Sequence, residues 1–242
     1  MAVGQSKVFK MKKKVSVLAI IPARGGSKTI PKKNIKLFCK KPLIYWSIIQ
    51  AKKSKRIDKV VVSSDSDEIL SFAKKFHVET IKRPKKISGD NSQTEETLLH
   101  ALNELEEKFD VSVLLQPTSP NRKPEDVDSA LEYFNKKKLD SCFSGTLLED
   151  FLIWKFSTKK KKFFSMNYNF KNRVMRQQRE PEYVENGSIY IFKNNLLKTK
   201  KNRIGGKIGI YLMDFWQSLE LDDPQDWILL QNIFKTYLSR YY

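Results

Sequence analysis

The chain has only two cysteines and two histidines among 242 residues, and this scarcity excludes several classes of protein. Cys39 and Cys142 are too few for a disulfide framework or a cysteine-rich zinc cluster, so we expect a reducing, cytoplasmic location. No apolar run has the length that a bilayer-spanning helix needs, so no membrane association is expected. Residues 1–13 are basic and lack an adequate apolar stretch and a small-residue cleavage site behind them, so we expect a flexible tail rather than a signal peptide.

Acidic residues are also in the minority, since 46 Lys and Arg stand against 27 Asp and Glu, a formal net charge of +19. Such an excess fits either a polyanionic partner or a basic surface that results from biased composition. We favour biased composition, because the lysines occur in short runs interleaved with acidic residues and without a nucleic-acid-binding motif. They also gather no aromatic platform for stacking bases. A nucleic-acid-binding protein stays an alternative, and it predicts steeply salt-dependent binding and no turnover.

What the chain does have is a repeated alternation of short apolar strands and amphipathic helices. Strands are expected at 15–21, 58–64, 78–81, 111–115, 141–145, 188–192, 207–213 and 219–221, and helices at 43–53, 67–76, 95–108, 124–137 and 224–237. This order predicts an α/β domain, residues 14–242, built on an open and mostly parallel sheet. The alternation stops at 151–185, where aromatic residues, lysine and asparagine dominate, and we expect a divergent hairpin arm used for dimerisation there.

The first predicted strand runs into the sequence IPARGGSKTIPKKN, a glycine-rich turn followed by several basic residues. Gly25 and Gly26 let the backbone approach a ligand without an intervening Cβ, and the N–H groups of such a turn bind phosphate oxygens. Arg24, Lys28 and Lys33 add charged donors. The string matches neither a Walker A loop nor a dinucleotide fingerprint, so the turn alone fits solvated lysines on a tight connection equally well.

Two further loops follow predicted strands, SSD at 63–65 and QPTSP at 116–120. Ligands of open parallel sheets bind outside the carboxyl ends of the strands, so the three loops are expected to share one site. We expect Asp65 or Ser66 to cap the next helix, and Asp65 to act as such a cap rather than as a metal ligand. Gln116 directly follows a buried strand, where its amide can bond hydroxyl or acyl groups, although a plain strand-to-helix loop is the alternative.

The segment SLELDD near the end of the chain places two carboxylates two residues apart. In a strand, Glu220 and Asp222 would share a face while Leu219 and Leu221 point to the core. Two carboxylates at this spacing make an oxygen-only site suited to Mg²⁺. The alternative is the polar outer face of an edge strand.

Six strings in this order resemble the acylneuraminate cytidylyltransferases, also called CMP-sialic acid synthetases. From about residue 15 to residue 240 they are IPARGGSKTIPKKN, VVVSSDSDEI, RPKKISGDNSQTEETLLHAL, LLQPTSPNR, RQQREPEYVENGSIYIF and SLELDDPQDW. The resemblance implies a Rossmann-like, mostly parallel open sheet with helices on both faces and a dimerisation arm. It implies a homodimeric enzyme that, with Mg²⁺, transfers CMP from CTP to the anomeric hydroxyl of a sialic-acid-like nine-carbon 2-keto sugar acid and releases pyrophosphate.

The resemblance also implies roles for individual residues of this chain. Arg24 and Lys28 would be the catalytic cations that hold the triphosphate. The implied nucleotide-binding set is Ala23, Arg24, Gly25, Gly26, Ser27, Lys28, Lys33, Asn34, Arg83 and Thr94. The implied sugar-binding set is Gln116, Arg176, Gln177 and Asn186, in which the Arg176 guanidinium would bind the sugar carboxylate. Glu220 and Asp222 would be the metal ligands.

The chain departs from the family's pattern at two of these places. Thr94 follows Gln93 where the family has a Ser-Ser pair, so one hydroxyl remains, and a helix cap is an equal alternative for it. Glu220 stands where the family has aspartate, so metal binding through water and direct metal binding both stay open. His77 and His100 are expected to be structural, which leaves the general base open between the sugar's own carboxylate and a metal-bound hydroxide.

The expected function is therefore CMP transfer to a nonulosonic acid. An enzyme of the same fold that uses GTP, UTP or another sugar stays an alternative, as does an inactive sugar-binding relative. The sequence does not decide among sialic, legionaminic and pseudaminic acids, because those sugars differ in substituents that the divergent segment 151–185 is expected to contact.

Overall fold

The computed structural model describes residues 15–242, and the tail expected at 1–13 lies outside the described residues. Within this range seven strands form one sheet in the order β11-β7-β10-β6-β1-β4-β5. The strands are β1 (Val17–Pro22), β4 (Lys59–Ser64), β5 (Glu79–Lys82), β6 (Val111–Leu115), β7 (Ser141–Leu147), β10 (Tyr183–Lys193) and β11 (Ile208–Leu212). Only β10 runs antiparallel to its neighbours in the described sheet, so the predicted mostly parallel sheet is confirmed.

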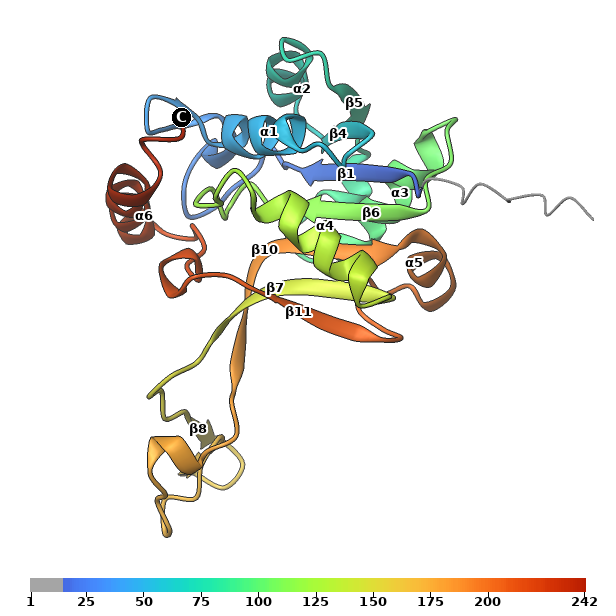
Figure 1. The fold of residues 1–242 in the computed structure, drawn as a ribbon. Helices are drawn as coiled ribbons and strands as arrows, with labels where there is room; N and C mark the ends of the chain where they lie inside the picture. Colours follow the sequence, from blue (N-terminus) through green and yellow to red (C-terminus); the bar gives the residue numbers. More distant parts are fainter. Residues whose placement is uncertain (1–14) are drawn as a thin grey trace, which may run out of the picture.

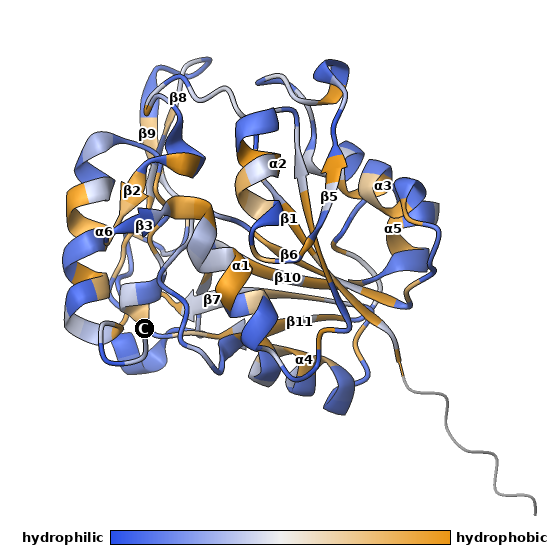
Figure 2. Cartoon of the chain, turned by 90° about the horizontal axis from the view of Figure 1, so that it is seen from above, coloured by the Kyte–Doolittle hydropathy of each residue, from blue (hydrophilic) through white to orange (hydrophobic). Residues whose placement is uncertain are grey.

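The central strands are apolar on both sides because helices cover both faces of the sheet (Figure 2). The helices are α1 (Leu43–Lys53), α2 (Asp67–Lys74), α3 (Thr94–Glu104), α4 (Asp126–Lys136), α5 (Asn194–Lys200) and α6 (Pro224–Tyr237). The helices α1, α2 and α4 pack on one face through residues such as Ile48 and Ile69. On the other face, α3 and α5 contribute Leu98 and Leu197. No helix within residues 15–242 is long and apolar enough to cross a membrane, and the cytoplasmic location stays a prediction.

A third apolar cluster joins α6 to the segment that follows the glycine-rich turn. Ile30 and Phe38 pack there with Trp46 of α1 and with Trp227 and Phe234 of α6. The segment also holds the short helix η1 (Lys33–Ile35) and the two-residue strands β2 (Leu37–Phe38) and β3 (Lys41–Pro42). This packing brings the end of the glycine-rich turn next to the start of α6.

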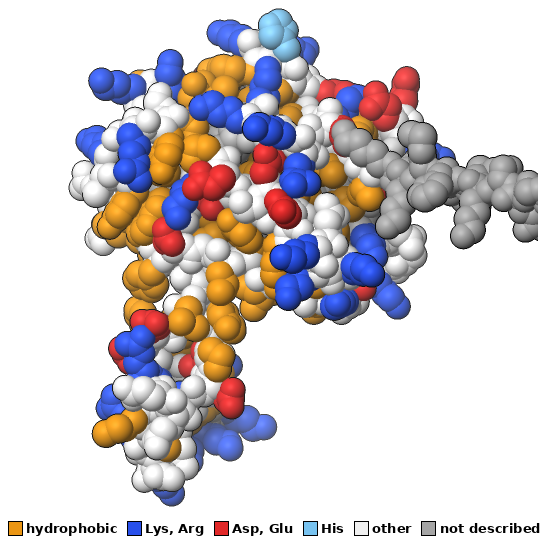
Figure 3. All heavy atoms as spheres, viewed as in Figure 1, with side chains coloured by type: hydrophobic (Ala, Val, Ile, Leu, Met, Phe, Trp, Pro, Cys, Tyr) orange, Lys and Arg blue, Asp and Glu red, His pale blue; other side chains and the backbone are white. Residues whose placement is uncertain are grey.

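The segment 151–185 forms an arm that projects away from the body of the molecule (Figure 1). Its antiparallel hairpin consists of β8 (Trp154–Ser157) and β9 (Lys162–Ser165), and the short helix η3 (Arg176–Gln178) follows. The expected hairpin is thus confirmed. Hydrophobic side chains gather on the body where the arm leaves it (Figure 3). The role of the arm in dimerisation stays a prediction.

The strand expected at 219–221 is not formed. Residues 218–222 form an irregular segment between η4 (Phe215–Gln217) and α6, and one backbone hydrogen bond, from Leu221 N to the Thr118 carbonyl at 2.8 Å, ties them to the loop after β6. Leu221 is fully buried as expected, whereas Leu219 is 38% exposed. The segment pairs with no strand of the described sheets, and α6 begins directly after it, where Asp223 caps the helix by accepting from Gln225 N at 2.7 Å.

Candidate active site

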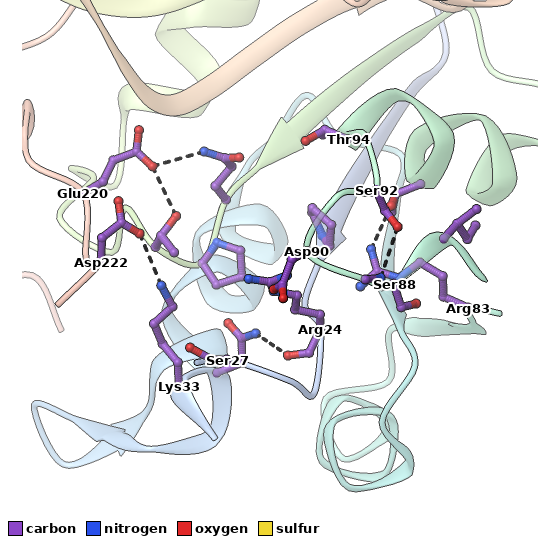
Figure 4. Close-up of a pocket in the computed structure, with 18 residues that line it drawn as sticks. Arg24, Ser27, Lys33, Arg83, Ser88, Asp90, Ser92, Thr94, Glu220 and Asp222 are labelled. Carbon is purple, nitrogen blue, oxygen red and sulfur yellow. Dashed lines mark hydrogen bonds and ion pairs between the residues drawn. The ribbon is translucent and has the colours of Figure 1, made fainter. Parts of the chain in front are cut away.

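A cavity of about 350 Å³ lies at the carboxyl ends of β1, β5 and β6, in the size range of small-molecule sites (Figure 4). Its lining comprises Pro22, Arg24, Ser27, Lys33, Asn34, Arg83, Ile87, Ser88, Gly89, Asp90, Ser92, Thr94, Thr97, Gln116, Pro117, Thr118, Glu220 and Asp222. The loops after β1 and β6 therefore share one cavity, as the rim of a parallel sheet predicts, whereas the loop at 63–65 that was expected to join them contributes no lining residue. Hereafter this cavity is called the rim pocket.

The glycine-rich turn is held against the turn between β4 and α2. The backbone N–H of Gly25 donates to Asp65 Oδ1 at 2.8 Å, and the Asn34 amide donates to the Arg24 carbonyl at 2.9 Å. Ser66, not Asp65, caps α2, because its hydroxyl accepts from Ile69 N at 3.5 Å. Of the two residues expected as the cap, the structure therefore uses Ser66 and not Asp65. Because Asp65 already occupies the Gly25 N–H, that amide does not add to a phosphate cradle.

Gly25 and Gly26 provide a matched test of this packing. A Cβ on Gly25 would lie 2.8 Å from Ser66 Cβ, whereas a Cβ on Gly26 would have no atom within 4 Å. We expect Gly25→Ala to lower the free energy of unfolding by about 1–3 kcal/mol, the usual cost of overpacking. Gly26→Ala should change it by less than about 0.5 kcal/mol. Urea unfolding measures both values, and equal stability of the two variants would contradict the contact.

The cations of the turn are paired with one acid across the rim pocket. Arg24 Nη1 lies 2.7 Å from Asp90 Oδ1, and Lys28 Nζ lies 2.6 Å from Asp90 Oδ2. These cations lower the pKa of the Asp90 carboxyl, with the Lys28 hydrogen bond as the largest cause. The Lys28 side chain is 82% exposed and lies at the edge of the pocket rather than in its lining.

Glu220 and Asp222 both line the rim pocket, although the segment that carries them is not a strand. Burial raises the pKa of the Glu220 carboxyl, and the neighbouring charge of Asp222 raises it further. Lys33, expected on a phosphate, instead donates to the Leu221 carbonyl at 2.8 Å and lies 3.3 Å from Asp222 Oδ1. Lys33 therefore holds the acidic segment in place.

Glu220 lies against a glycine whose replacement would displace the Glu220 carboxylate. Gly187 has φ = +64°, and a Cβ built on it would be 1.9 Å from Glu220 Oε1. The Gln116 amide donates to the Gly187 carbonyl at 2.8 Å and to Glu220 Oε2 at 3.4 Å. The Thr118 hydroxyl lies 3.5 Å from the same oxygen. Gln116, expected in the sugar pocket, thus lines the rim pocket and also orients one of its acids.

Asn186 does not face the rim pocket. Its side chain is fully buried and accepts from the Ser144 hydroxyl at 2.6 Å, while its amide donates to the Gln217 carbonyl at 3.3 Å. The expectation that Asn186 contacts the sugar directly is therefore corrected, because its polar atoms hold the irregular register of β10. The pair Asn186-Gly187 lies inside this strand and is not the hairpin turn that its sequence alone would indicate.

The wall opposite the acids is formed by Arg83 and the start of α3. Arg83 is 6% exposed, and its Nη1 donates to Thr97 Oγ1 at 2.8 Å. Its Nε is buried without a hydrogen-bond partner among the described residues. Burial lowers the pKa of Arg83, and the nearby positive charge of Arg24 acts in the same direction. Thr94 is the first residue of α3 and lines the pocket, whereas the cap position falls on Gln93.

Two residues expected at the sugar lie on the arm instead. Arg176 and Gln177 belong to η3, outside the lining of the rim pocket. Arg176 pairs with Glu149 and with Asp150, the latter at 3.2 Å. Within one chain they therefore do not meet a ligand of the pocket, and their contact with the sugar stays a prediction.

Several pocket residues have no counterpart among the expected site residues. The lining residues that were not expected include Ser88, Asp90, Ser92, Thr97 and Thr118. Most of them lie in the polar, turn-rich stretch between Arg83 and α3. A polar loop that follows a strand of a parallel sheet is a signal for a site residue, although it does not say which side chain turns inward.

Comparisons with known proteins agree with this geometry. A family model described as cytidylyltransferase matches residues 18–237. N-acylneuraminate cytidylyltransferase A of Danio rerio is 35% identical over 226 residues, which are 93% of this chain and 52% of that protein. The CMP-N,N'-diacetyllegionaminic acid synthase of Legionella pneumophila is 31% identical over 224 residues, 90% of this chain and 96% of that protein. The chain thus spans about half the length of the Danio rerio relative and nearly all of the Legionella pneumophila one.

Solved structures share the fold. The CMP:2-keto-3-deoxy-manno-octonic acid synthetase complexed with CTP superposes with a TM-score of 0.68 and 16% identity, over 92% of this chain and all of that chain. A 4-diphosphocytidyl-2C-methyl-D-erythritol synthase superposes with a TM-score of 0.67 and 14% identity, over 91% of this chain and all of that chain. At such identities the likeness shows a common fold.

Proposed function

Because this chain belongs to the cytidylyltransferase family, we propose that it transfers CMP from CTP to the anomeric hydroxyl of a sialic-acid-like nine-carbon 2-keto sugar acid and releases pyrophosphate. The observation that carries the proposal is the arrangement of the rim pocket, in which Arg24 of the glycine-rich turn lines the same cavity as the carboxylates of Glu220 and Asp222 (Figure 4). The sugar class follows from the relatives, whose names specify acylneuraminate and legionaminic acid.

The triphosphate would bind between the glycine-rich turn and the acidic segment. Arg24 lines the pocket, and Lys28 lies close enough to share a partner with it. Two cations on adjacent sides of a phosphate group offset the negative charge that develops on the departing pyrophosphate, and fixed donors of this kind need no reorganisation during the reaction. They also hold the α-phosphorus in line for attack by the sugar hydroxyl.

The cytosine base would bind beside Arg83. Its Nε is a buried donor without a protein partner among the described residues, and an unsatisfied buried donor costs free energy unless a ligand acceptor meets it. Cytosine offers such acceptors in its O2 and N3 atoms. Thr97 fixes the guanidinium through its hydroxyl, and Thr94 lies in the same lining.

The pair Glu220 and Asp222 fits Mg²⁺ that arrives with the nucleotide. Within residues 15–242 no group of three His, Cys, Asp or Glu side chains gathers to hold a metal alone. Mg²⁺ usually takes one or two carboxylates and completes its shell with water and substrate phosphates, so two hard oxygen donors facing a phosphate site suit it. When bound, the ion would neutralise phosphate charge and polarise the phosphoryl group. Lys33 keeps the acidic segment at the pocket meanwhile, through its bond to the Leu221 carbonyl.

The sugar would occupy the side of the pocket near Gln116 and Thr118. The Gln116 amide is fixed by the Gly187 carbonyl, so its plane is preorganised for hydroxyl or acyl groups of a ligand. Neither histidine belongs to the lining of the rim pocket as the structure describes it. We therefore assign no imidazole to the proton transfer, and the sugar carboxylate is the candidate acceptor.

Pyrophosphate release from nucleotide and sugar acid tests the proposal. We expect release from CTP that requires both Mg²⁺ and a nonulosonic acid, with sialic, legionaminic and pseudaminic acids compared in parallel. Release from CTP should exceed release from UTP, GTP and ATP at equal concentration, since Arg83 and its neighbours would select the base. Faster turnover with UTP or GTP would show that another nucleotide is the substrate. No turnover with any of these sugar acids would contradict the proposed substrate class.

We also propose that the chain acts as a homodimer joined by its arms. The arm exposes large apolar side chains, among them Phe156, Phe163 and Met166, which are 48%, 67% and 54% exposed. A mostly apolar hollow lies at the base of the same arm, and its lining comprises Thr146, Leu147, Glu149, Phe151, Leu212, Met213 and Phe215. A projecting apolar segment and an apolar hollow on one chain suit a two-fold interface, in which each copy supplies both parts.

Light scattering after size-exclusion chromatography tests this assembly. The double change Phe163→Asp and Phe164→Asp should convert a dimer into a monomer, because it places charge in the apolar contact. Ile228→Asp is the matched control, since Ile228 is 66% exposed on α6 and away from the arm. It should leave the dimer intact. A wild-type monomer at micromolar concentration would contradict the proposal.

A further inference from the structure

We propose that Asp90 is an internal competitor of the nucleotide: its carboxylate pairs with the cations proposed to bind the triphosphate and must leave them before CTP binds. The inference relies on the proposed function for the identity of the ligand. It adds a residue that was not expected at the site and assigns it a task, which is to set the affinity of the site for polyanions.

The geometry of the contact resembles that of a bound anion. One oxygen of Asp90 lies 2.7 Å from Arg24 Nη1 and the other lies 2.6 Å from Lys28 Nζ. A single carboxylate thus bridges the two cations proposed for the triphosphate. The cations come from the turn after β1 and the acid comes from the loop before α3, so the contact crosses the rim pocket (Figure 4).

The contact is weak enough to exchange. The Arg24 and Asp90 side chains are 40% and 43% exposed, and water screens such pairs strongly. A triphosphate brings several negative charges to the same cations and would repel a carboxylate that stayed between them. Phosphate and Asp90 therefore exclude each other, and binding of the nucleotide is an exchange of anions.

The loop that carries Asp90 can move without disturbing the sheet. The loop begins with the short helix η2 (Lys85–Ile87), in which Ile87 N donates to the Pro84 carbonyl at 3.1 Å. Gly89 N donates to the Ser92 hydroxyl at 3.1 Å, and the Ser88 hydroxyl donates to the Pro84 carbonyl at 2.9 Å. These bonds stay within the loop. Among the described contacts, the Asp90 ion pairs are the ones that tie it to the glycine-rich turn.

Such an exchange has consequences at both ends of a turnover. A ligand with one phosphate charge displaces Asp90 less readily than a triphosphate does, so the site favours polyanions over nucleoside monophosphates. After CMP transfer, the returning Asp90 competes with pyrophosphate for Arg24 and Lys28 and speeds its release. The affinity of the site for polyanions is thereby kept below what its cations alone would give.

The test measures binding of inorganic tripolyphosphate by calorimetry at low salt, without CTP or a sugar. Asp90→Asn keeps the shape of the side chain and removes its charge. We expect this variant to bind tripolyphosphate about three- to tenfold more tightly than the wild type, the range that two exposed ion pairs supply. Pyrophosphate should also inhibit the variant at correspondingly lower concentration.

Glu68→Gln is the matched control. Glu68 of α2 pairs at 2.9 Å with Lys32, which follows Arg24 and Lys28 in the chain, yet neither Glu68 nor Lys32 lines the rim pocket. The control changes the net charge by the same amount, so a purely long-range electrostatic effect would tighten binding in both variants. Tighter binding in Asp90→Asn alone supports the competitor.

Equal or weaker tripolyphosphate binding by Asp90→Asn overturns the inference, as does an equal gain in Glu68→Gln. The outcome is separable from the proposed function. Tighter binding in Asp90→Asn, together with no CTP turnover by the wild type, would support the role of Asp90 and contradict the proposed reaction. CTP turnover by the wild type, together with no tighter tripolyphosphate binding in Asp90→Asn, would support the proposed reaction and contradict the role of Asp90.

Discussion

Arg24→Ala is expected to lower kcat/KM for CTP by about 10²–10³-fold while the fold stays intact. Arg24 follows β1 and lines the rim pocket where the triphosphate is proposed to bind. Lys33 is the other basic residue of the described turn that lines the cavity. Lys33 is engaged by the Leu221 carbonyl and Asp222, so it cannot substitute for Arg24 without releasing the acidic segment. A steady-state pyrophosphate-release assay measures the loss.

The matched control for this change is Arg56→Ala. Arg56 is an exposed arginine that pairs with Glu132 at 3.2 Å, away from the rim pocket. It should keep kcat/KM within about twofold, as surface substitutions away from a site generally do. Circular dichroism and thermal unfolding should show both variants folded. If Arg24→Ala kept its activity within about threefold of the wild type, the proposal that Arg24 binds the triphosphate would be contradicted.

Arg122→Ala is expected to lower the free energy of unfolding by about 4 kcal/mol, through unsatisfied acceptors and a cavity. Arg122 is fully buried, and burial lowers its pKa to about 10, so it stays charged at neutral pH. Its guanidinium makes five hydrogen bonds to the carbonyls of Gln116 and Ser188 and to the side chains of Ser47 and Gln50. It therefore joins α1, the end of β6 and the irregular part of β10 behind the rim pocket.

Urea unfolding measures the loss, and Arg122→Lys separates charge from geometry. Lysine keeps the charge but lacks the planar fork that serves two carbonyls at once, so it should recover only part of the stability. Arg122 holds the carbonyl of Gln116 and that of Ser188, the residue after Gly187, and so positions both sides of the proposed sugar site. The lysine variant should therefore also raise KM for the sugar acid more than KM for CTP. A loss below about 1 kcal/mol in Arg122→Ala would contradict the assignment, since such a value fits a surface residue.

The sequence predicted the regular elements well where their signals are local. Leu43–Lys53 and Val111–Leu115 have the predicted bounds, because apolar periodicity and flanking polar residues define them within a few residues. The rim location of the site also followed, since it depends only on strand direction and on the loops that end each strand. Glu220 and Asp222 both line the pocket, as expected, although the strand on which that expectation relied is not formed.

Features set by contacts distant in the sequence were not predicted. The segment 219–221 alternates like a strand, but it has no strand to pair with, and Leu219 stays exposed. Asn186 has the sequence of a turn, but Ser144 and the Gln217 carbonyl bury it inside β10. Asp90 lies in a loop without periodic pattern, and only the folded chain shows that it meets Arg24 and Lys28.

A crystal structure of this protein with CTP and Mg²⁺ tests the central claim most directly. The account predicts the triphosphate in the rim pocket, with its oxygens within hydrogen-bond distance of Arg24 and Lys28, the cytosine ring beside Arg83, and Asp90 displaced from both cations. CTP bound elsewhere on the chain, with Asp90 still paired to Arg24 and Lys28, would contradict it.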